Sequence, residues 1–76
     1  MKYNECNEHT EVEKYAAATI KDLRIKANWQ CKDVGALMGI HAGTISAIEN
    51  NRIKLTVRHI AFFAEIFEVP VKTFFR

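Results

Sequence analysis

The stretch CKDVGALMGIHAGTISAIENN, residues 31–51, decides the fold of this chain. Its apolar residues recur at helical spacing in two short groups, and Gly39 separates the groups. These apolar residues are Val34, Leu37, Met38, Ile40, Ile45 and Ile48. Two short helices joined by a tight glycine turn form a helix-turn-helix pattern, and we expect the helices over about residues 31–38 and 42–50.

Two motifs within this stretch are Val34-Gly35-x-x-Met38-Gly39-Ile40 and Thr44-Ile45-Ser46-x-Ile48-Glu49-Asn50. They resemble the Cro and phage-repressor (XRE-type) helix-turn-helix family, which also includes restriction-modification controller proteins and some antitoxins. The resemblance extends from about Ile20 to Phe75. It implies a compact all-α domain of five helices, similar to that of lambda repressor, in which only a small residue fits at Gly35.

The segment before the motif predicts a tail and one longer helix. Residues 1–10 are polar, lack periodicity and carry like charges, which favours a mobile tail before a domain of residues 11–76. Thr10 and the glutamate three residues later have the spacing of a capping box, so the helix is expected to begin there. We expect it to end at about Ala27, where Asn28 suits a left-handed conformation.

Two further helices are expected after the motif. Asn51 occupies a position that favours a positive φ. Thr56 is the expected cap of a helix over about residues 57–67, and Pro70 suits the first turn of a closing helix over about residues 70–75. No segment shows the alternation of a strand, so the sequence predicts five helices and an all-α fold.

The composition indicates one small domain with a basic surface. A chain of 76 residues buries only about 60% of its unfolded surface, so a second copy would add stability. No apolar run approaches the roughly 18 residues of a membrane span, and no signal-peptide pattern is present, so we expect a cytoplasmic protein. The net charge is +2, but residues 14–76 carry ten Lys or Arg against five Asp or Glu, a balance that suits phosphate binding.

The cysteines and histidines do not indicate a metal site or a catalytic site. Cys6 and Cys31 are expected as reduced thiols, because disulfide frameworks belong to secreted chains. Cys6-x-x-His9 has ligand-like spacing, but no second pair accompanies it. Nothing in the spacing brings Cys31 to His41 or His59 as a nucleophile and its base. We therefore expect no cofactor, no metal and no enzymatic activity.

The resemblance implies contacts with the phosphates of duplex DNA at two places. In the family, the start of the first motif helix and the end of the second meet the DNA backbone. The residues at these positions are Gln30, Lys32, Asn50, Asn51, Arg52 and Lys54. Such contacts set the register of the protein on DNA and supply most of its affinity. Cys31 replaces a family glutamine and does not reach a phosphate in the same way.

The residues that meet bases in the family are small in this chain. They are Ala42, Gly43, Thr44 and Ala47, and His41 precedes them. None can bond a base edge bidentately, as Gln, Arg or Asn does. Two interpretations stay open. Either the helix lies deep in the major groove and sequence choice comes from methyl contacts, bound water and DNA deformability, or base recognition has been lost and the fold binds a protein.

Two further features bear on docking and assembly. The family counterparts of Arg24 and Glu49 form a partly buried ion pair, which implies that this pair holds the second motif helix at its docking angle. Four apolar residues near the C-terminus predict a dimer interface, and they are Phe62, Ile66, Phe74 and Phe75. A two-fold dimer places two recognition helices about one DNA turn apart, or roughly 34 Å.

Together these features predict a DNA-binding transcriptional regulator of the repressor type, acting as a homodimer on a pseudo-palindromic operator in double-stranded DNA. It would block or recruit RNA polymerase. The pattern Asn51-Arg52-x-x-Leu55-Thr56 favours a restriction-modification controller protein. The alternative is an antitoxin, or a protein-interaction module that uses the same fold to bind a protein partner.

Overall fold

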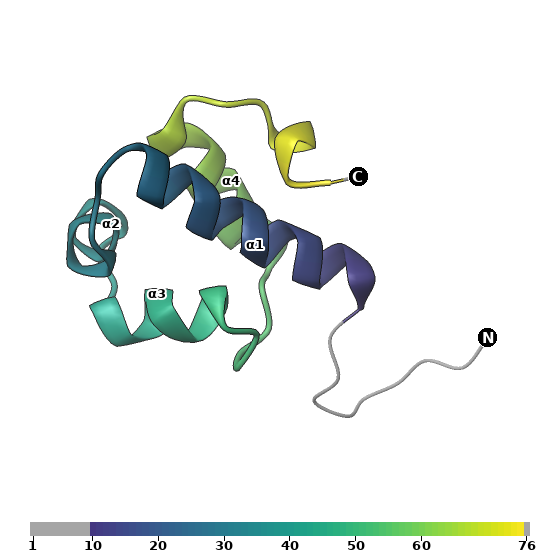
Figure 1. Cartoon of the computed structure of the whole chain (residues 1–76), viewed down its shortest axis with the longest axis horizontal. Coiled ribbons are helices and arrows are strands. Elements are labelled where there is room, and N and C mark those ends of the chain that lie inside the picture. Colours follow the sequence, from purple (N-terminus) through teal and green to yellow (C-terminus); the bar gives the residue numbers. More distant parts are fainter. Residues whose placement is uncertain (1–9, 76) are drawn as a thin grey trace.

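The computed structural model describes residues 10–75, which form four α-helices and one 3₁₀ turn (Figure 1). The elements are α1 (Glu11–Lys26), α2 (Cys31–Met38), α3 (Ala42–Glu49), α4 (Val57–Phe67) and η1 (Val71–Phe74). No strand occurs within these residues, so the predicted all-α fold is confirmed. Apart from Thr10, the expected tail lies outside the described residues.

The prediction of a fifth α-helix over residues 70–75 is wrong. The Thr73 N–H donates to the Pro70 carbonyl at 2.9 Å, and the Phe75 N–H donates to the Lys72 carbonyl at 3.1 Å. Both bonds span three residues, as in a 3₁₀ helix, and Phe75 is already extended. A segment of four residues is too short to establish the four-residue hydrogen-bond ladder of an α-helix.

Side-chain caps begin α1 and α4 where the sequence predicts them. Thr10 Oγ1 accepts from the Glu13 N–H at 3.1 Å, and Glu13 Oε1 accepts from the Thr10 N–H at 2.8 Å. This is a complete capping box. At α4, Thr56 Oγ1 accepts from the His59 N–H at 3.1 Å. Each cap satisfies backbone groups that the first helical turn leaves without a partner.

A non-glycine residue in the left-handed conformation follows three of the four α-helices. Asn28 and Asn51 have φ values of 63° and 59°, as predicted for both positions. Glu68 also has a positive φ, 56°, at the end of α4. Asparagine tolerates this conformation better than other residues with a Cβ, whereas glutamate has no such preference.

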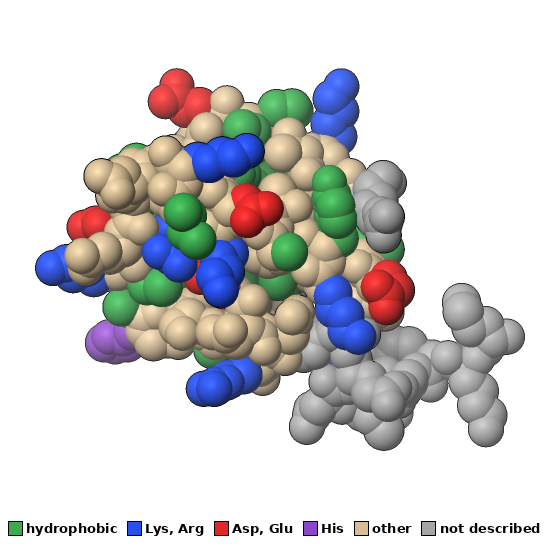
Figure 2. All heavy atoms as spheres, viewed as in Figure 1, with side chains coloured by type: hydrophobic (Ala, Val, Ile, Leu, Met, Phe, Trp, Pro, Cys, Tyr) green, Lys and Arg blue, Asp and Glu red, His purple; other side chains and the backbone are tan. Residues whose placement is uncertain are grey.

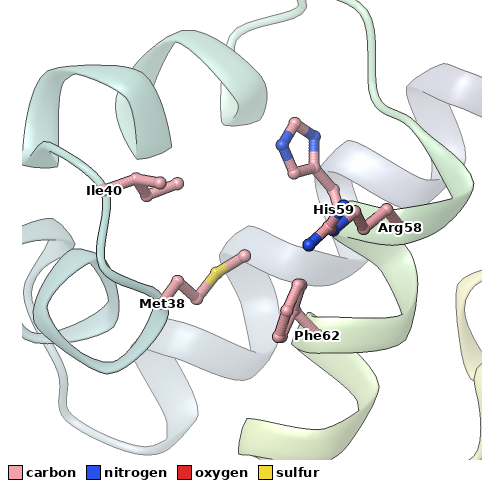
Figure 3. Close-up of a pocket in the computed structure, with 5 residues that line it drawn as sticks. All are labelled: Met38, Ile40, Arg58, His59 and Phe62. Carbon is pink, nitrogen blue, oxygen red and sulfur yellow. The ribbon is translucent and has the colours of Figure 1, made fainter.

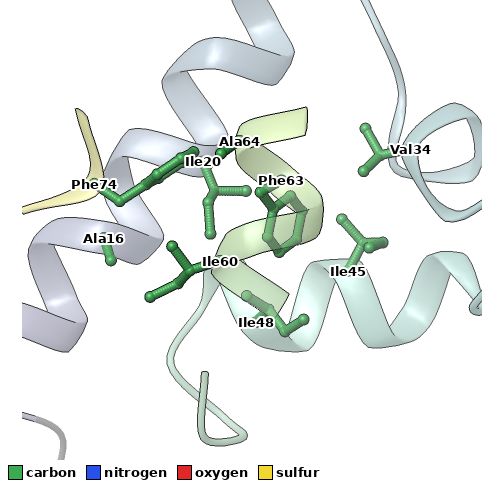
Figure 4. Packing of buried hydrophobic residues seen from close by; sticks show 9 residues of the cluster. All are labelled: Ala16, Ile20, Val34, Ile45, Ile48, Ile60, Phe63, Ala64 and Phe74. Carbon is green, nitrogen blue, oxygen red and sulfur yellow. The ribbon is translucent and has the colours of Figure 1, made fainter. Parts of the chain in front are cut away.

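In Figure 1, α1 passes in front of α4, with α2 and α3 to one side of it. Figure 4 shows side chains from all four α-helices and from η1 meeting in the core. They are Ala16, Ile20, Val34, Ile45, Ile48, Ile60, Phe63, Ala64 and Phe74. One continuous cluster therefore joins the helix-turn-helix to α1, α4 and η1, and fixes the position of α3.

Several apolar side chains of the helices are exposed, and Leu37 and Val57 are among them. Leu37 is 57% exposed and Val57 is 83% exposed. α2 has only about two turns, and its buried side is formed by Val34 and Gly35. Val57 is the first residue of α4 and precedes the turn that packs on the core. Among the described residues, no helix has both the length and the apolar character needed to cross a membrane.

Candidate nucleic-acid interface

The turn between α2 and α3 is closed by backbone contacts. Gly39 has a φ of 73°, and the Ile40 N–H donates to the Gly35 carbonyl at 2.9 Å. A Cβ placed on Gly35 would lie 2.5 Å from the Ile40 carbonyl oxygen and 3.3 Å from the Ala42 nitrogen. The chain entering α3 therefore passes directly over Gly35. This agrees with the expectation of a small residue there and holds α3 close against α2.

A buried ion pair fixes the other end of α3. Arg24 Nε donates to Glu49 Oε2 at 2.6 Å, and Arg24 Nη2 donates to Glu49 Oε1 at 3.0 Å. The exposed fractions of the two side chains are 15% and 3%. The hydrogen bond with Glu49 raises the pKa of Arg24 above its ordinary value. The ion pair expected from the resemblance is thus present, with two-point geometry.

Arg24 also reaches the loop between α1 and α2. Its Nη1 donates to the Trp29 carbonyl at 2.9 Å. The Trp29 ring stacks on Phe67, with 5.6 Å between centroids, and Phe67 stacks on Phe63 at 6.2 Å. The Trp29 side chain therefore packs this loop against α4. Together these contacts set the start of α2 relative to α3.

The α3 residues expected to meet bases have small side chains and do not belong to the buried core cluster. Gly43 and His41, the N-cap of α3, are exposed, and Ala42, Thr44 and Ala47 are half-buried. A Cβ placed on Gly43 would meet no protein atom within 4 Å. Nothing in the fold of the described chain requires a glycine at this exposed helical position.

The residues expected to contact phosphates lie toward the two ends of α3. Figure 1 shows α2 at one end of α3 and the loop after α3 at the other. On the face in Figure 2, a basic side chain projects near this loop. Gln30, Lys32, Arg52 and Lys54 are exposed. Three exposed cations and one exposed amide thus lie at the start of α2 and in the loop after α3.

Some of these groups already have partners within the chain. The Gln30 N–H donates to Asp33 Oδ2 at 2.7 Å, so only its side chain is left for a phosphate. Asn50 Nδ2 donates to the Ser46 carbonyl at 2.8 Å. Asn51 Oδ1 is buried and has no hydrogen-bond partner. Asn50 therefore offers less to DNA than its position in the motif suggests.

The expected dimer residues separate into two groups. Phe62 and Phe75 are 41% and 40% exposed, and Ile66 is half-buried against the core. Phe74 is fully buried. Its assignment to a dimer surface is corrected, because the side chain fills the space between η1 and the helices of its own chain (Figure 4).

No group of three metal-ligating side chains occurs among residues 10–75. Cys31 is a half-buried free thiol. Cys6 and His9, which have ligand-like spacing, lie outside the described residues.

The sequence comparisons agree with this geometry. A family model described as helix-turn-helix matches residues 20–74, most of the chain. The chain belongs to the Cro/C1-type helix-turn-helix family. No curated protein matched the chain. Members of this XRE-type family are DNA-binding transcriptional regulators and are generally not enzymes, and this chain is a DNA-binding regulator of that type.

The sequence did not indicate a hollow between the α2–α3 turn and α4. It has a volume of about 260 Å³ and is lined by Met38, Ile40, Arg58, His59 and Phe62 (Figure 3). Its one sequence signal is the four-residue spacing of Arg58 and Phe62, which places the guanidinium 5.9 Å from the ring centroid. This hollow lies on the side of the α2–α3 turn that faces α4.

Proposed function

We propose that this XRE-type protein regulates transcription by binding a pseudo-palindromic operator as a homodimer, with α3 in the major groove. One observation carries the proposal. α3 is fixed by the contact over Gly35 and by the Arg24–Glu49 pair, while its face from Ala42 to Ala47 takes no part in the buried core. A helix that is held rigidly and is free on one face suits insertion into a groove.

The surroundings of α3 supply the attraction for DNA. Lys32, Arg52 and Lys54 are exposed. None of the three forms an ion pair that the structure shows among the described residues. Glu49 is neutralised by Arg24 and so does not repel phosphates. Cations of this kind contribute to binding of any duplex and set the register for α3.

Small side chains on α3 support close approach to base pairs. Ala42, Ala47 and the Thr44 methyl suit contact with thymine methyl groups, and Gly43 adds no side chain. With no long polar side chain on this face, sequence choice would rest on such methyl contacts, bridging water and DNA shape. A dimer bound across an operator would then exclude or recruit RNA polymerase.

One observation favours the alternative of an antitoxin or another protein-binding module. The same face is small and lacks the side chains that read base edges bidentately. A protein partner could cover such a face, and the exposed cations would then lie at the rim of that contact.

Selection of binding sites from random duplex DNA at two salt concentrations tests these alternatives. The proposal predicts recovery of a two-fold symmetric sequence and a steep loss of affinity with added salt. If no sequence is enriched even at low salt, the operator proposal is refuted and the protein-binding alternative is favoured.

An Ala47→Glu substitution tests whether α3 enters the groove. A carboxylate on this face would repel DNA and abolish binding to the selected site, because like charges placed together are destabilising. Ala18→Glu is the matched control, since Ala18 is exposed on α1 and the charge change is the same. Both variants should keep the circular dichroism of the parent. Tight operator binding by the Ala47→Glu variant would remove α3 from the interface.

A further inference from the structure

Four residues on the exposed face of α4 are arranged so that they complement the same four residues of an antiparallel helix. Arg58, Ala61, Phe62 and Glu65 are spaced by three, four and seven residues, so they share one side of the helix. All four are exposed, and Phe62 presents a large apolar ring there. We call these four residues the α4 stripe. Opposite charges, Arg58 and Glu65, lie at its two ends, and Ala61 and Phe62 lie between them.

The charges of this stripe are placed unfavourably for a single helix. Arg58 lies in the first turn of α4, at the positive end of the helix dipole. Glu65 lies in the last turn, at the negative end. No ion pair is seen for either side chain in the described part of the chain. Within the monomer, the Arg58 guanidinium lies 5.9 Å from the Phe62 ring centroid, but no opposite charge neutralises Arg58 or Glu65 among the described residues.

A second copy in antiparallel orientation resolves each of these features. When two α4 helices pack antiparallel about a point between Ala61 and Phe62, Arg58 faces the partner's Glu65, and Glu65 faces the partner's Arg58. Phe62 then lies over the partner's Ala61, a large residue against a small one. Each charge also comes near the end of the partner helix whose dipole favours it.

We propose that α4 pairs with α4 of a second copy in this antiparallel register, and that the pairing forms the two-fold contact of the dimer. The inference rests on the homodimer of the proposed function and names its contact surface. An isologous contact requires a self-complementary surface, and the stripe satisfies this in both charge and size. Of the expected dimer residues, Phe62 becomes central, and half-buried Ile66 lies at the edge.

Charge reversal at two positions tests the pairing in the absence of DNA. In an Arg58→Glu homodimer, the introduced carboxylate would face the partner's Glu65. In a Glu65→Arg homodimer, the introduced guanidinium would face the partner's Arg58. Each single variant should therefore dimerise about tenfold more weakly than the parent in sedimentation equilibrium. An equimolar mixture of the two variants should form heterodimers at parental strength, because both cross-pairs are again attractive.

Two controls make the outcome specific. The double variant Arg58→Glu/Glu65→Arg should dimerise more strongly than either single variant, since its two cross-pairs are again attractive. Lys72→Glu changes an exposed charge outside α4 and should leave dimerisation unchanged. Circular dichroism confirms that each variant is folded.

The proposal is overturned if the parent stays monomeric both free and on operator DNA, or if the mixture of single variants associates no better than either alone. It is also overturned if neither single variant is weakened, as parallel helices would predict. A parent that dimerises through α4 but enriches no DNA sequence refutes the proposed function and keeps this contact. If the parent binds a two-fold operator but charge changes in α4 do not alter dimerisation, the α4 contact is refuted and the proposed function is kept.

Discussion

Replacing Gly43 by alanine should raise the stability of the protein and weaken its binding to DNA. The position lies inside α3, and an added Cβ would meet no protein atom within 4 Å. Glycine in the middle of a helix is about 0.5–1 kcal/mol less stable than alanine, and Gly43 is the second residue of α3, so Gly43→Ala should raise the free energy of unfolding by at most about that amount. For a domain of this size, the melting temperature should rise by at most about 8 °C.

The same methyl group should weaken binding to the selected operator. If the α3 backbone approaches the base pairs at Gly43, a Cβ must displace DNA or tilt the helix. Overpacking of this kind costs about 1–3 kcal/mol, which is a loss in affinity of about 5- to 150-fold. Thermal unfolding and a fluorescence-anisotropy titration on the same preparation measure both effects.

Gly35→Ala is the matched control, because it adds the same methyl group to the other helix of the motif. Its Cβ would lie 2.5 Å from the Ile40 carbonyl oxygen, and real Cβ contacts essentially never fall below 3.0 Å. The turn must therefore shift by about 0.5 Å, and we expect a net loss of about 1–2 kcal/mol in stability after the gain in helix propensity. A Gly43→Ala variant that binds its operator as tightly as the parent would refute close approach at this residue.

Three further outcomes follow from the same geometry. Arg24→Ala should cost about 3–5 kcal/mol of stability in chemical denaturation, because it leaves the Glu49 carboxylate buried without its partner, and a Glu49→Gln change added to it should recover part of the loss. Arg52→Ala and Lys54→Ala should weaken binding to all duplexes alike and reduce the slope of log affinity against log salt by about 0.9 for each phosphate that the variant no longer neutralises. Glu68→Gly should raise the melting temperature, because glycine adopts the left-handed conformation at the end of α4 without the cost of about 1 kcal/mol that a Cβ imposes.

Helix ends were predictable because they depend on local chemistry. Thr10 and Thr56 accept hydrogen bonds from backbone groups three residues away, so the sequence alone indicates them. The left-handed Asn28 and Asn51 are signalled in the same way. Burial depends instead on which neighbour covers a helix. The exposure of Leu37 could not be inferred from its spacing, since a helix of two turns buries only one narrow side.

The candidate site shows the same division between local and distant contacts. Arg24 and Glu49 are 25 residues apart, and only the family resemblance linked them before the structure placed them in contact. The engagement of Asn50 with the Ser46 carbonyl depends on a side-chain conformation that no sequence pattern encodes. Motif position alone therefore overstated the availability of Asn50 for phosphate.

Half-site spacing should govern operator choice more strongly than base identity at any one position. The α3 face has no long side chain to form bidentate bonds, which contribute about 1–3 kcal/mol each in other complexes, so each half-site discriminates weakly. A dimer joined through α4 fixes the distance and rotation between its two α3 helices. Inserting one base pair between the half-sites rotates them by about 34–36° and separates them by about 3.4 Å, so both α3 helices cannot sit in their grooves at once. The insertion should therefore cost more affinity than any single base substitution, as measured by competition binding on a matched set of duplexes. If base substitutions proved more costly than the insertion, the helices would be reading bases independently, and the rigid α4 contact would not set the geometry of recognition.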